Sequence, residues 1–360
     1  MTASELPCRH PDFGHSEFYA SVVVLAWNGR EFLPECLNSV RADACRHVEI
    51  IVVDNGSTDG SAQFVRVSFP DAILIENGAN LGFSKGCNIG AKRARGEALV
   101  FLNQDTRVEP GWLAHLVSPV LLDKGVGVST GKLLLGDTAR IDCTGGYLTL
   151  WTGPGSLHHG VPQDDVVKGI LRPFFGCGAA MAVRRELFLS IGGFDEQIFA
   201  FGDDLDLSWR LRLLGFGVVY APFATIHHAH SGSWGVLTPR KFRLVTENHI
   251  RVLLKCLSGP NLLHALLGYI AFATLKAMVL GFLYRDPTFV RHVGGALRSN
   301  MRKWRTLRRD RAAVQMHRKK SDRAILASDG FGLCASFPNL WRTLSAQRDM
   351  LSNRAEFQRR

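Results

Sequence analysis

Apolar runs alternate with polar, turn-forming segments along the first 105 residues. The β-branched runs at 21–26 (SVVVLA) and 48–54 (VEIIVVD) are typical of strands buried on both faces of a parallel sheet. Shorter apolar runs predict further strands at 73–76 and 98–102, and 3.6-residue periodicity between the runs predicts helices that end near Val40, Val67 and Arg95. This βα alternation predicts an α/β chain with a Rossmann-like, doubly wound, mostly parallel sheet.

Polar clusters follow three of these strands. They are Trp27-Asn28, residues 54–59 (DNGSTD) and residues 103–105 (NQD). Each cluster alone fits a turn with a helix N-cap. Three such clusters at the carboxyl ends of parallel strands favour the interpretation that they line one ligand-binding crevice. The first βα turn has no G-x-G-x-x-G and the chain has no G-x-x-x-x-G-K-[ST] loop, so dinucleotide and P-loop binding are excluded.

The charge is divided unevenly along the chain. Its 360 residues suit two domains or one domain with an appendage, and 46% hydrophobic content with 21% charged residues excludes wholesale disorder. Residues 1–238 carry 19 Lys and Arg against 25 Asp and Glu, whereas residues 239–360 carry 24 against 7. Such a split indicates two parts with different partners.

The cysteines and the N-terminus bear on the compartment. None of the eight cysteines forms a C-x-x-C pair, which favours buried free thiols in a reducing compartment. The first 18 residues lack an apolar core, so we expect no secretory signal.

The basic tail contains a long apolar segment. Residues 262–283 are apolar apart mainly from His264 and Lys276, and about 33 Å of helix would cross a bilayer. Cations follow, several of them at helix-like intervals, at Arg285, Arg291, Arg298, Arg302, Lys303, Arg305, Arg308 and Arg309. We expect helices that lie on an anionic membrane face, with a true span and plain helical packing as alternatives. Nucleic-acid binding is not expected, because no recognised motif accompanies the charge.

Seven segments carry a resemblance to a known family. Residues 24–28 (VLAWN), 52–59 (VVDNGSTD), 80–90 (NLGFSKGCNIG) and 101–105 (FLNQD) resemble the family 2 glycosyltransferases of the GT-A fold. Downstream, residues 176–181 (GCGAAM), 192–196 (GGFDE) and 201–210 (FGDDLDLSWR) look like the rhamnosyltransferase-type branch. The resemblance covers about residues 20–236. It implies an N-terminal extension at 1–19, a GT-A domain at 20–238, and a basic, partly apolar helical extension at 239–360.

The resemblance implies a site for a nucleotide-diphosphate sugar at the strand ends. The donor-binding positions that it implies are Ala26, Trp27, Asn28, Asp54, Asn55, Ser57, Asn80, Gly82, Asn88, Asn103, Gly178 and Asp203. Among these, Asp54 would accept hydrogen bonds from the base or ribose, which suits a carboxylate. Gly178 belongs to a loop that would close over the donor sugar.

The resemblance also implies a divalent metal, Mg²⁺ or Mn²⁺, on the diphosphate. Asp105 ends the family's D-x-D-like motif, whose first position here is Asn103, so one charged ligand is missing. His228 matches the family's downstream histidine best and would complete the metal shell, with His230 as the alternative. A zinc site is disfavoured, because no cysteine or further histidine stands at a suitable spacing.

The acidic run at 203–206 implies the catalytic base. Asp204 matches the family's general base, which would take the acceptor hydroxyl's proton, and Asp203 stands where the family has Glu. Carboxylates also suit a helix N-terminus, and for Asp206 that structural interpretation is equally good. Trp151 fits stacking on a sugar and packing in a core equally well.

The expected activity is that of a metal-dependent, inverting hexosyltransferase. It would move a sugar, rhamnose as the first guess, to a lipid-linked or polysaccharide acceptor at the cytoplasmic face of the cell membrane, in cell-envelope polysaccharide biosynthesis. The alternative is a catalytically impaired protein of the same fold that binds nucleotide sugars or glycans, and Asn103 is its main argument. The donor base, acceptor, linkage and oligomeric state stay open.

Overall fold

The structure is a computed structural model that describes residues 20–43, 48–166, 171–229, 238–327 and 331–332. His230 and the predicted N-terminal extension lie outside the described residues. The chain forms two compact units: Met1–Gly146 with Ser156–His230, and Tyr147–Gly155 with Ser231–Arg360. The second unit thus includes a short segment from the middle of the first. The boundary that the sequence suggests at 238 stays a prediction.

A mixed, nine-stranded sheet forms the centre of the first unit, in the order β3-β2-β1-β4-β10-β6-β11-β5, with β7 paired to β6. Its strands are β1 (Ala20–Ala26), β2 (Val48–Asp54), β3 (Ile73–Glu76), β4 (Ala98–Asn103), β5 (Thr106–Val108), β6 (Val126–Leu135), β7 (Ile141–Cys143), β10 (Ala180–Arg184) and β11 (Gly217–His228).

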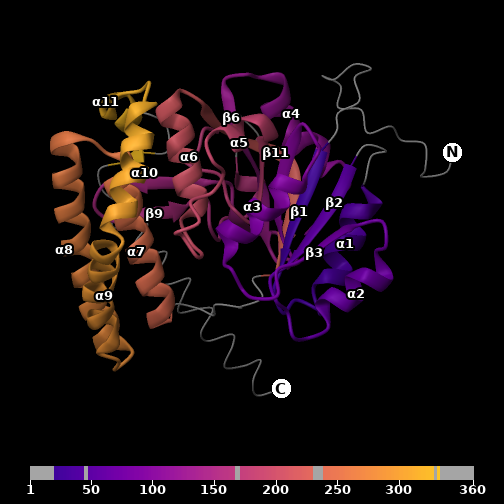
Figure 1. Ribbon diagram of the computed structural model, residues 1–360, viewed down its shortest axis with the longest axis horizontal. Helices are drawn as coiled ribbons and strands as arrows, with labels where there is room; N and C mark the ends of the chain where they lie inside the picture. Colours follow the sequence, from indigo (N-terminus) through magenta and orange to yellow (C-terminus); the bar gives the residue numbers. More distant parts are fainter. Residues whose placement is uncertain (1–19, 44–47, 167–170, 230–237, 328–330, 333–360) are drawn as a thin grey trace. The chain divides into compact units, whose positions relative to one another are not determined.

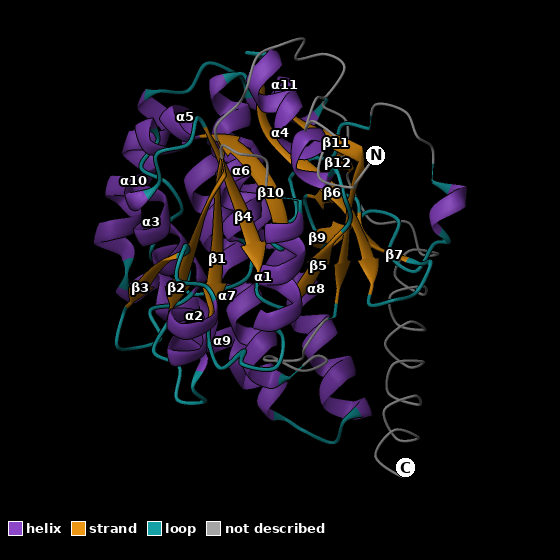
Figure 2. Cartoon of the chain, turned by 90° about the vertical axis from the view of Figure 1, so that its right-hand side faces the viewer, coloured by secondary structure: helices purple, strands orange, loops and turns teal. Residues whose placement is uncertain are grey.

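The four strands predicted from apolar runs are parallel neighbours. Ala26 at the end of β1 pairs with Asp54 at the end of β2, and Leu25 pairs with Asn103 at the end of β4. Figure 2 shows β1, β2 and β4 as adjacent arrows that run the same way. The polar clusters therefore emerge at one edge of the sheet. Beyond β4 the sheet turns antiparallel, because β10 runs opposite to both β4 and β6.

Helices cover both faces of this sheet (Figure 1). One face packs on α1 (Leu33–Ala42), α2 (Ser61–Ser68) and α4 (Trp112–Leu122). The other face packs on α3 (Phe83–Arg93), α5 (Arg185–Ser190) and α6 (Asp203–Leu214). Successive residues of β1 serve opposite faces: Val22 and Val24 pack with the first group of helices, and Val23 packs with the second. A strand buried on both sides explains the unbroken β-branched run in the sequence.

The second unit is mainly helical. Its helices are α7 (Pro239–Cys256), α8 (Gly259–Leu283), α9 (Thr288–Arg302), α10 (Trp304–Met316) and α11 (Asp322–Leu326). A three-stranded sheet has the order β12-β8-β9, with β8 (Gly146–Thr149), β9 (Gly153–Ser156) and β12 (Phe331–Gly332). Trp151, between β8 and β9, packs edge-to-face on His264 of α8, with ring centroids 5.1 Å apart. This contact favours a packing role for Trp151.

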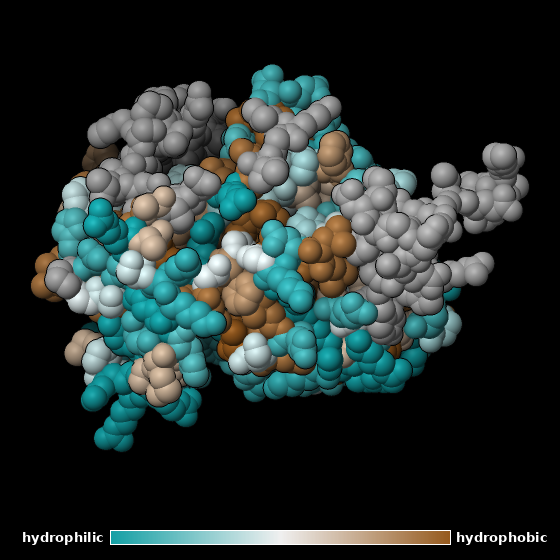
Figure 3. All heavy atoms as spheres, turned by 90° about the horizontal axis from the view of Figure 1, so that it is seen from above, coloured by the Kyte–Doolittle hydropathy of each residue, from teal (hydrophilic) through white to brown (hydrophobic). Residues whose placement is uncertain are grey.

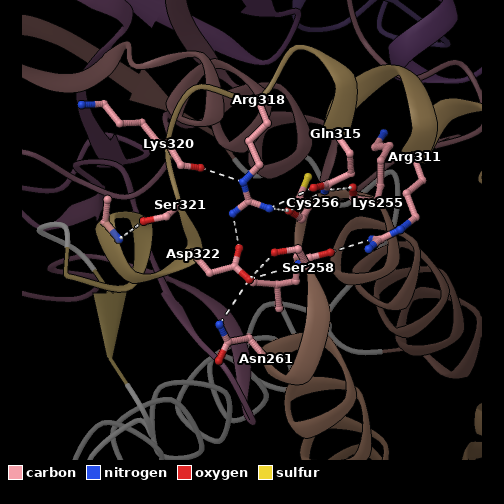
Figure 4. Close-up of polar contacts among 12 residues, drawn as sticks. Lys255, Cys256, Ser258, Asn261, Arg311, Gln315, Arg318, Lys320, Ser321 and Asp322 are labelled. Atoms are coloured by element: carbon pink, nitrogen blue, oxygen red, sulfur yellow. Dashed lines mark hydrogen bonds and ion pairs between the residues drawn. The ribbon is translucent and has the colours of Figure 1, made fainter.

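Side chains from α10 satisfy the carbonyl end of α7 (Figure 4). Arg311 donates to the Leu257 oxygen at 2.6 Å, and Gln315 donates to the Cys256 oxygen at 3.0 Å. Asp322 accepts from the Ser258 amide at 3.1 Å and forms an ion pair with Arg318. The last carbonyls of a helix have no partner inside it, so these contacts hold the corner between α7 and α8. Part of the tail's basic charge therefore serves internal capping.

Helix α8 keeps most of its apolar surface uncovered. By length and composition its segment Asn261–Leu283 could cross a membrane, and only 22% of its most apolar window is buried. Large side chains recur on its exposed surface at helical spacing: Leu263, Leu267, Leu275, Met278, Val279, Phe282 and Leu283. We call these seven residues the α8 apolar stripe. Figure 3 shows the molecule from above, where brown apolar residues reach the surface among teal polar ones.

Strand β11 runs without a break from Gly217 to His228, through Ala221 and Pro222. A shift in pairing with β6 between Ala221 and Thr225 absorbs Pro222 as an irregularity, as proline in sheets requires. His227 and His228 therefore lie within the strand.

Candidate active site

The turn after β2 interlocks with the turn after β1. The Asn28 amide donates to Ser57 Oγ at 2.9 Å, and the Thr58 amide donates to Asn28 Oδ1 at 2.8 Å. Asn28 has φ of 47°, a left-handed conformation that asparagine tolerates better than most residues. The Asn55 amide donates to the Ala26 oxygen at 2.7 Å. The first two polar clusters are thus one preformed structure.

Asp54 uses one of its two carboxylate oxygens in the turn. Its Oδ2 accepts from the amides of Gly56 and Ser57 at 3.1 and 3.0 Å, whereas the buried Oδ1 has no hydrogen-bond partner among the residues that the structure describes. A buried acceptor left unpaired costs free energy. The group is suited to receive a donor from a ligand, as expected for a contact with a base or ribose.

Gln104 fixes Trp27 from the neighbouring strand end. Its Oε1 accepts from the Trp27 amide at 2.8 Å, and its Nε2 donates to the Trp27 oxygen at 3.0 Å. A Cβ on Gly29 would stand 2.1 Å from Gln104 Oε1, so a larger residue there would displace the Gln104 amide from Trp27. Sequence reasoning placed Gln104 in the cluster but missed this function, because the pairing joins residues far apart in the chain.

Two predicted donor-binding asparagines organise the loop before α3. Asn55 Nδ2 donates to Asn80 Oδ1 at 3.2 Å and to the Gly82 oxygen at 3.1 Å. Asn80 Oδ1 also accepts from the Gly82 amide at 3.0 Å. Gly82 has φ of 84°, and a Cβ there would meet the Phe199 oxygen at 2.5 Å. These contacts shape the loop, and direct contact with a nucleotide stays a prediction.

Asn88 uses both ends of its amide on a loop beyond β10. Its Nδ2 donates to the Phe194 oxygen at 3.0 Å and its Oδ1 accepts from the Phe194 amide at 2.9 Å. The side chain is buried. These bonds favour a structural role for Asn88, and its contact with the nucleotide also stays a prediction.

The two predicted metal ligands lie together. His228 Nε2 is 3.5 Å from Asp105 Oδ1 and 3.5 Å from Asn103 Nδ2. The pairing of β11 with β5 explains this, because Thr106, directly after Asp105, pairs with His228. The other ring nitrogen of His228, Nδ1, is 2.9 Å from Asp142 Oδ2. Sequence reasoning missed Asp142, which belongs to no recognised motif.

Charge around His228 is strongly negative. Burial alone would lower its pKa, but the hydrogen bonds and charges of Asp105 and Asp142 outweigh burial and raise the pKa to about 10. The same carboxylates that favour a proton on the His228 ring would also favour a metal ion that takes the place of the proton on Nε2. The residues fit a divalent ion that takes one carboxylate and one imidazole from the protein and its other ligands from phosphates and water. Among the described residues, no group of three or more His, Cys, Asp or Glu side chains has a metal-ligating arrangement.

The predicted base lies at the start of α6. Asp204 Oδ2 accepts from the Gly178 amide at 3.1 Å, and Oδ1 accepts from the Leu205 amide at 2.8 Å. Burial raises the pKa of Asp204 against these hydrogen bonds. Burial and the charge of Asp204 raise the pKa of the buried Asp203 well above its usual value. A raised pKa makes a carboxylate a better proton acceptor.

The loop at 178–179 links the base to the end of β4. The Asn103 amide donates to the Ala179 oxygen at 3.0 Å, one residue after Gly178 meets Asp204. A Cβ on Gly178 would lie 3.3 Å from Asp203 Oδ2, so glycine permits this close approach. The predicted metal ligands and the predicted base therefore border the same strand end.

Asp206 has a structural role. It is fully buried and pairs with Arg210 one turn later at 2.8 Å. Arg210 also donates to the Gly193 oxygen at 2.7 Å. This pair fixes α6 to the loop that Asn88 holds, and it favours the structural interpretation of Asp206.

Similar proteins give an independent view of this site. The chain is 29% identical over 241 residues to an N-acetylglucosaminyl-diphospho-decaprenol L-rhamnosyltransferase of Mycobacterium tuberculosis, covering 58% of this chain and 76% of that protein. It is 26% identical over 276 residues to N-acetylgalactosaminyltransferase 7 of Drosophila melanogaster, covering 68% of this chain and 46% of that one.

Solved structures show the same fold. GalNAc-T7, solved with UDP, GalNAc and Mn²⁺, has a TM-score of 0.57 at 17% identity, over 77% of this chain and 55% of that one. A mannosyltransferase of Pyrobaculum calidifontis, solved with GDP-Man and Mn²⁺, has a TM-score of 0.51 at 17% identity, over 84% and 87%. The predicted GT-A fold is confirmed.

Family models decide the assignment. The model for glycosyl transferase family 2 matches residues 21–134. The model for glycosyl transferase family group 2 matches residues 98–297, more than half of the chain. The resemblance that the motifs suggested is confirmed, and the chain belongs to the family 2 glycosyltransferases.

Proposed function

We propose that this glycosyltransferase moves a sugar from a nucleoside diphosphate to an acceptor hydroxyl by a single displacement with inversion. The observation that carries the proposal is the carboxylate of Asp204, held by the Gly178 amide at 3.1 Å. A base on the acceptor side of the sugar would take the hydroxyl proton as that oxygen attacks the anomeric carbon. The raised pKa of Asp204 suits it to this step.

Asp105 and His228 would hold a divalent ion, Mg²⁺ or Mn²⁺. When bound, the ion supplies positive charge against the leaving diphosphate. The protein's part is to present an imidazole and a carboxylate 3.5 Å apart, with Asn103 beside them. On the nucleoside side, Asp54 would accept a hydrogen bond through its unpaired Oδ1, beside Trp27 and Asn28.

The similar proteins support a proposal for the sugar and the acceptor. The mycobacterial relative is named for L-rhamnosyl transfer to a diphospho-decaprenol-linked N-acetylglucosamine. A more distant relative, 23% identical over 244 residues and matched over 57% of its length, is a poly-β-1,6-N-acetyl-D-glucosamine synthase of Staphylococcus aureus. We propose rhamnose as the donor sugar, a lipid-linked or polysaccharide acceptor, and a place in cell-envelope polysaccharide biosynthesis.

A lipid-linked acceptor calls for a location at a membrane. The α8 apolar stripe supports this, because Leu267 is 59% exposed and Phe282 84% exposed. Exposed arginines on the next helices, such as Arg298 and Arg305, would suit anionic headgroups. We propose that the second unit rests on the cytoplasmic face of the membrane, with α8 in the interface.

A donor screen tests the reaction. Thermal unfolding of the full chain with a panel of nucleotide sugars, with and without Mn²⁺, identifies the base and sugar. We expect Mn²⁺-dependent stabilisation by one donor, followed by transfer to a lipid-linked acceptor. Binding without transfer or donor hydrolysis would instead favour a binding protein that has lost catalysis.

Variants of the metal motif extend this test. Asp105→Ala should abolish Mn²⁺-dependent donor binding, because Asp105 is the motif's only carboxylate. Undiminished Mn²⁺-dependent affinity for the nucleoside diphosphate would contradict the assignment. Asn103→Asp restores the family's usual first position, and we expect tighter metal binding from the added charge.

A further inference from the structure

A buried carboxylate outside every family motif lies against the candidate metal site. Asp142 is in the middle of β7 and is 5% exposed. A carboxylate removed from water costs free energy unless hydrogen bonds or opposite charge compensate for it. Its partners therefore indicate what it does.

Both oxygens of this carboxylate meet imidazole nitrogens. Oδ2 is 2.9 Å from Nδ1 of His228, and Oδ1 is 3.3 Å from Nδ1 of His159. His159 Nδ1 is also 2.9 Å from the backbone oxygen of Asp142. The contact with His228 leaves the opposite ring nitrogen, Nε2, toward Asp105 at 3.5 Å.

The sheet explains why the three groups line up. β7 pairs with β6, β6 pairs with β11, and β11 pairs with β5. His228, at the end of β11, is therefore flanked by Asp142 on one side and by Asp105, directly before β5, on the other. This order results from long-range strand pairing, so no local sequence pattern reveals it.

We propose that Asp142 is a positioning residue that holds the His228 imidazole with Nε2 directed at the divalent cation. The proposal rests on the proposed function, in which Asp105 and His228 share that cation. A carboxylate that accepts Nδ1–H fixes the ring's orientation and keeps the lone pair for metal on Nε2. It also makes the ligand nitrogen more basic, and loss of such a partner typically lowers metal affinity about 10–100-fold.

Two substitutions separate this role from simple packing. Asp142→Leu keeps the approximate shape and removes the acceptor, whereas Asp142→Asn keeps an acceptor oxygen and removes the charge. We expect Asp142→Leu to weaken Mn²⁺ binding by about 10–100-fold. Asp142→Asn should lose less Mn²⁺ affinity than Asp142→Leu, because it retains an acceptor for the His228 N–H. It should still bind Mn²⁺ more weakly than the unaltered protein.

The measurement uses Mn²⁺ alone and the full chain, so it does not depend on turnover. Free Mn²⁺ is counted by electron paramagnetic resonance, which gives the dissociation constant. Electron spin-echo modulation from ¹⁴N then reports whether an imidazole nitrogen is bound to the ion. We expect this modulation in the unaltered protein, its loss in His228→Ala, and its reduction in Asp142→Leu.

Two further variants serve as controls. Asp137→Asn removes an exposed carboxylate near the same strands and should leave Mn²⁺ affinity unchanged. His159→Ala leaves the contact between Asp142 and His228 in place and should also keep the ¹⁴N modulation. Thermal unfolding without metal establishes that each variant is folded. If Asp142→Leu does not fold, the affinity of Asp142→Asn decides the question.

Each outcome has a distinct meaning. The positioning role is overturned if a folded Asp142→Leu, or Asp142→Asn, binds Mn²⁺ as tightly as the unaltered protein and shows full ¹⁴N modulation. In that case the proposed function still stands if Asp105→Ala and His228→Ala lose Mn²⁺ binding. Equal Mn²⁺ binding in the unaltered protein, Asp105→Ala and His228→Ala overturns both proposals.

Discussion

Two helices of this chain begin with buried carboxylates, and the two starts differ in their surroundings. At α6, burial and mutual repulsion raise the pKa of Asp203, and burial raises that of Asp204. At α11, burial would raise the pKa of Asp322, but hydrogen bonds from Arg318, Ser258 and Asn261 outweigh it and lower the pKa.

The difference separates a functional from a structural use of the same residue. Asp322 lies among donors that stabilise its negative charge, and its hydrogen bonds stabilise the corner between α7 and α8. Burial raises the proton affinity of both Asp203 and Asp204, and the charge of Asp204 raises that of Asp203 further. This arrangement costs stability and favours proton transfer.

The first prediction concerns Asp204→Asn, which keeps size and polarity but cannot accept the acceptor's proton. We expect transfer to fall by about 10²–10⁴-fold while the donor's dissociation constant moves little. In the unaltered protein the rate should fall as pH decreases through the raised pKa of Asp204, because the base must be ionised. Turnover, donor affinity and a pH profile are measured, with the exposed Asp164→Asn as the control.

Near-normal turnover in Asp204→Asn would move the base to another residue. A larger loss of turnover in Asp203→Asn, with donor binding intact, would assign the base to Asp203.

The second prediction concerns Asp322→Ala, which leaves the partly buried Arg318 without its ion-pair partner. We expect a loss of about 3–5 kcal/mol in the free energy of unfolding of the second unit. Because the pKa of Asp322 is lowered, its stabilisation is present above its unfolded pKa and is lost as pH falls through its folded value. Denaturant unfolding across this acidic range measures both effects, and the exposed Lys319→Ala is the control.

An equal loss of stability in Asp322→Ala at pH values above and below this range would mean that shape, not charge, matters there.

The third prediction concerns the α8 apolar stripe. Phe282→Asp and Leu267→Asp should each weaken binding to anionic vesicles, since burying such a side chain contributes about 1.5–3 kcal/mol. Binding of the unaltered chain should weaken with salt, because charges are screened over about 8 Å at physiological ionic strength. Vesicle co-sedimentation measures this. Leu122→Asp, on an exposed apolar residue of the first unit, is the matched control.

Failure of the full chain to bind anionic vesicles at low salt would remove the membrane interpretation. Equal weakening by the Leu122 control would show that the effect is not specific to α8.

The fourth prediction is the smallest and reverses the sign of the second. Asp203→Asn removes a charge that burial and Asp204 disfavour, so the variant should be more stable at neutral pH. The raised pKa means that Asp203 favours folding at low pH and loses this contribution as pH rises through its folded value. The gain should therefore shrink in acid. Each 1 kcal/mol corresponds to about 2–4 °C in melting temperature for domains of 150–250 residues.

A lower melting temperature for Asp203→Asn at neutral pH would show that its charge stabilises the fold.

The sequence predicted the parallel half of the fold well because its signals are local. The runs at 21–26 and 48–54 correspond to β1 and β2 within one residue, and the predicted strands at 73–76 and 98–102 are β3 and β4. The antiparallel part was harder. The pairing of β10 with β4 joins residues about 80 positions apart, and its pairing with β6 joins residues about 50 positions apart. No local periodicity indicates such pairs.

The site shows the same division. Motif positions such as Asp105, His228 and Asp204 could be named from the sequence, and strand pairing brings the first two together. The roles of Asp142 and Gln104 could not be predicted from the sequence, because each depends on a contact that only the folded sheet creates. The internal bonds of Asn55 and Asn88 were invisible for the same reason, although both residues lie in recognisable motifs.

During synthesis on the ribosome, the strands of the small sheet in the second unit become available at very different times. In that sheet β12 runs parallel to β8, with Phe331 paired to Leu148. Synthesis at about 5–20 residues per second leaves β8 waiting roughly 10–40 s for this partner. During that interval β8 has a free edge open to other chains. Nascent protein that stalls before β12 is therefore the form in which we expect aggregation and chaperone binding to begin.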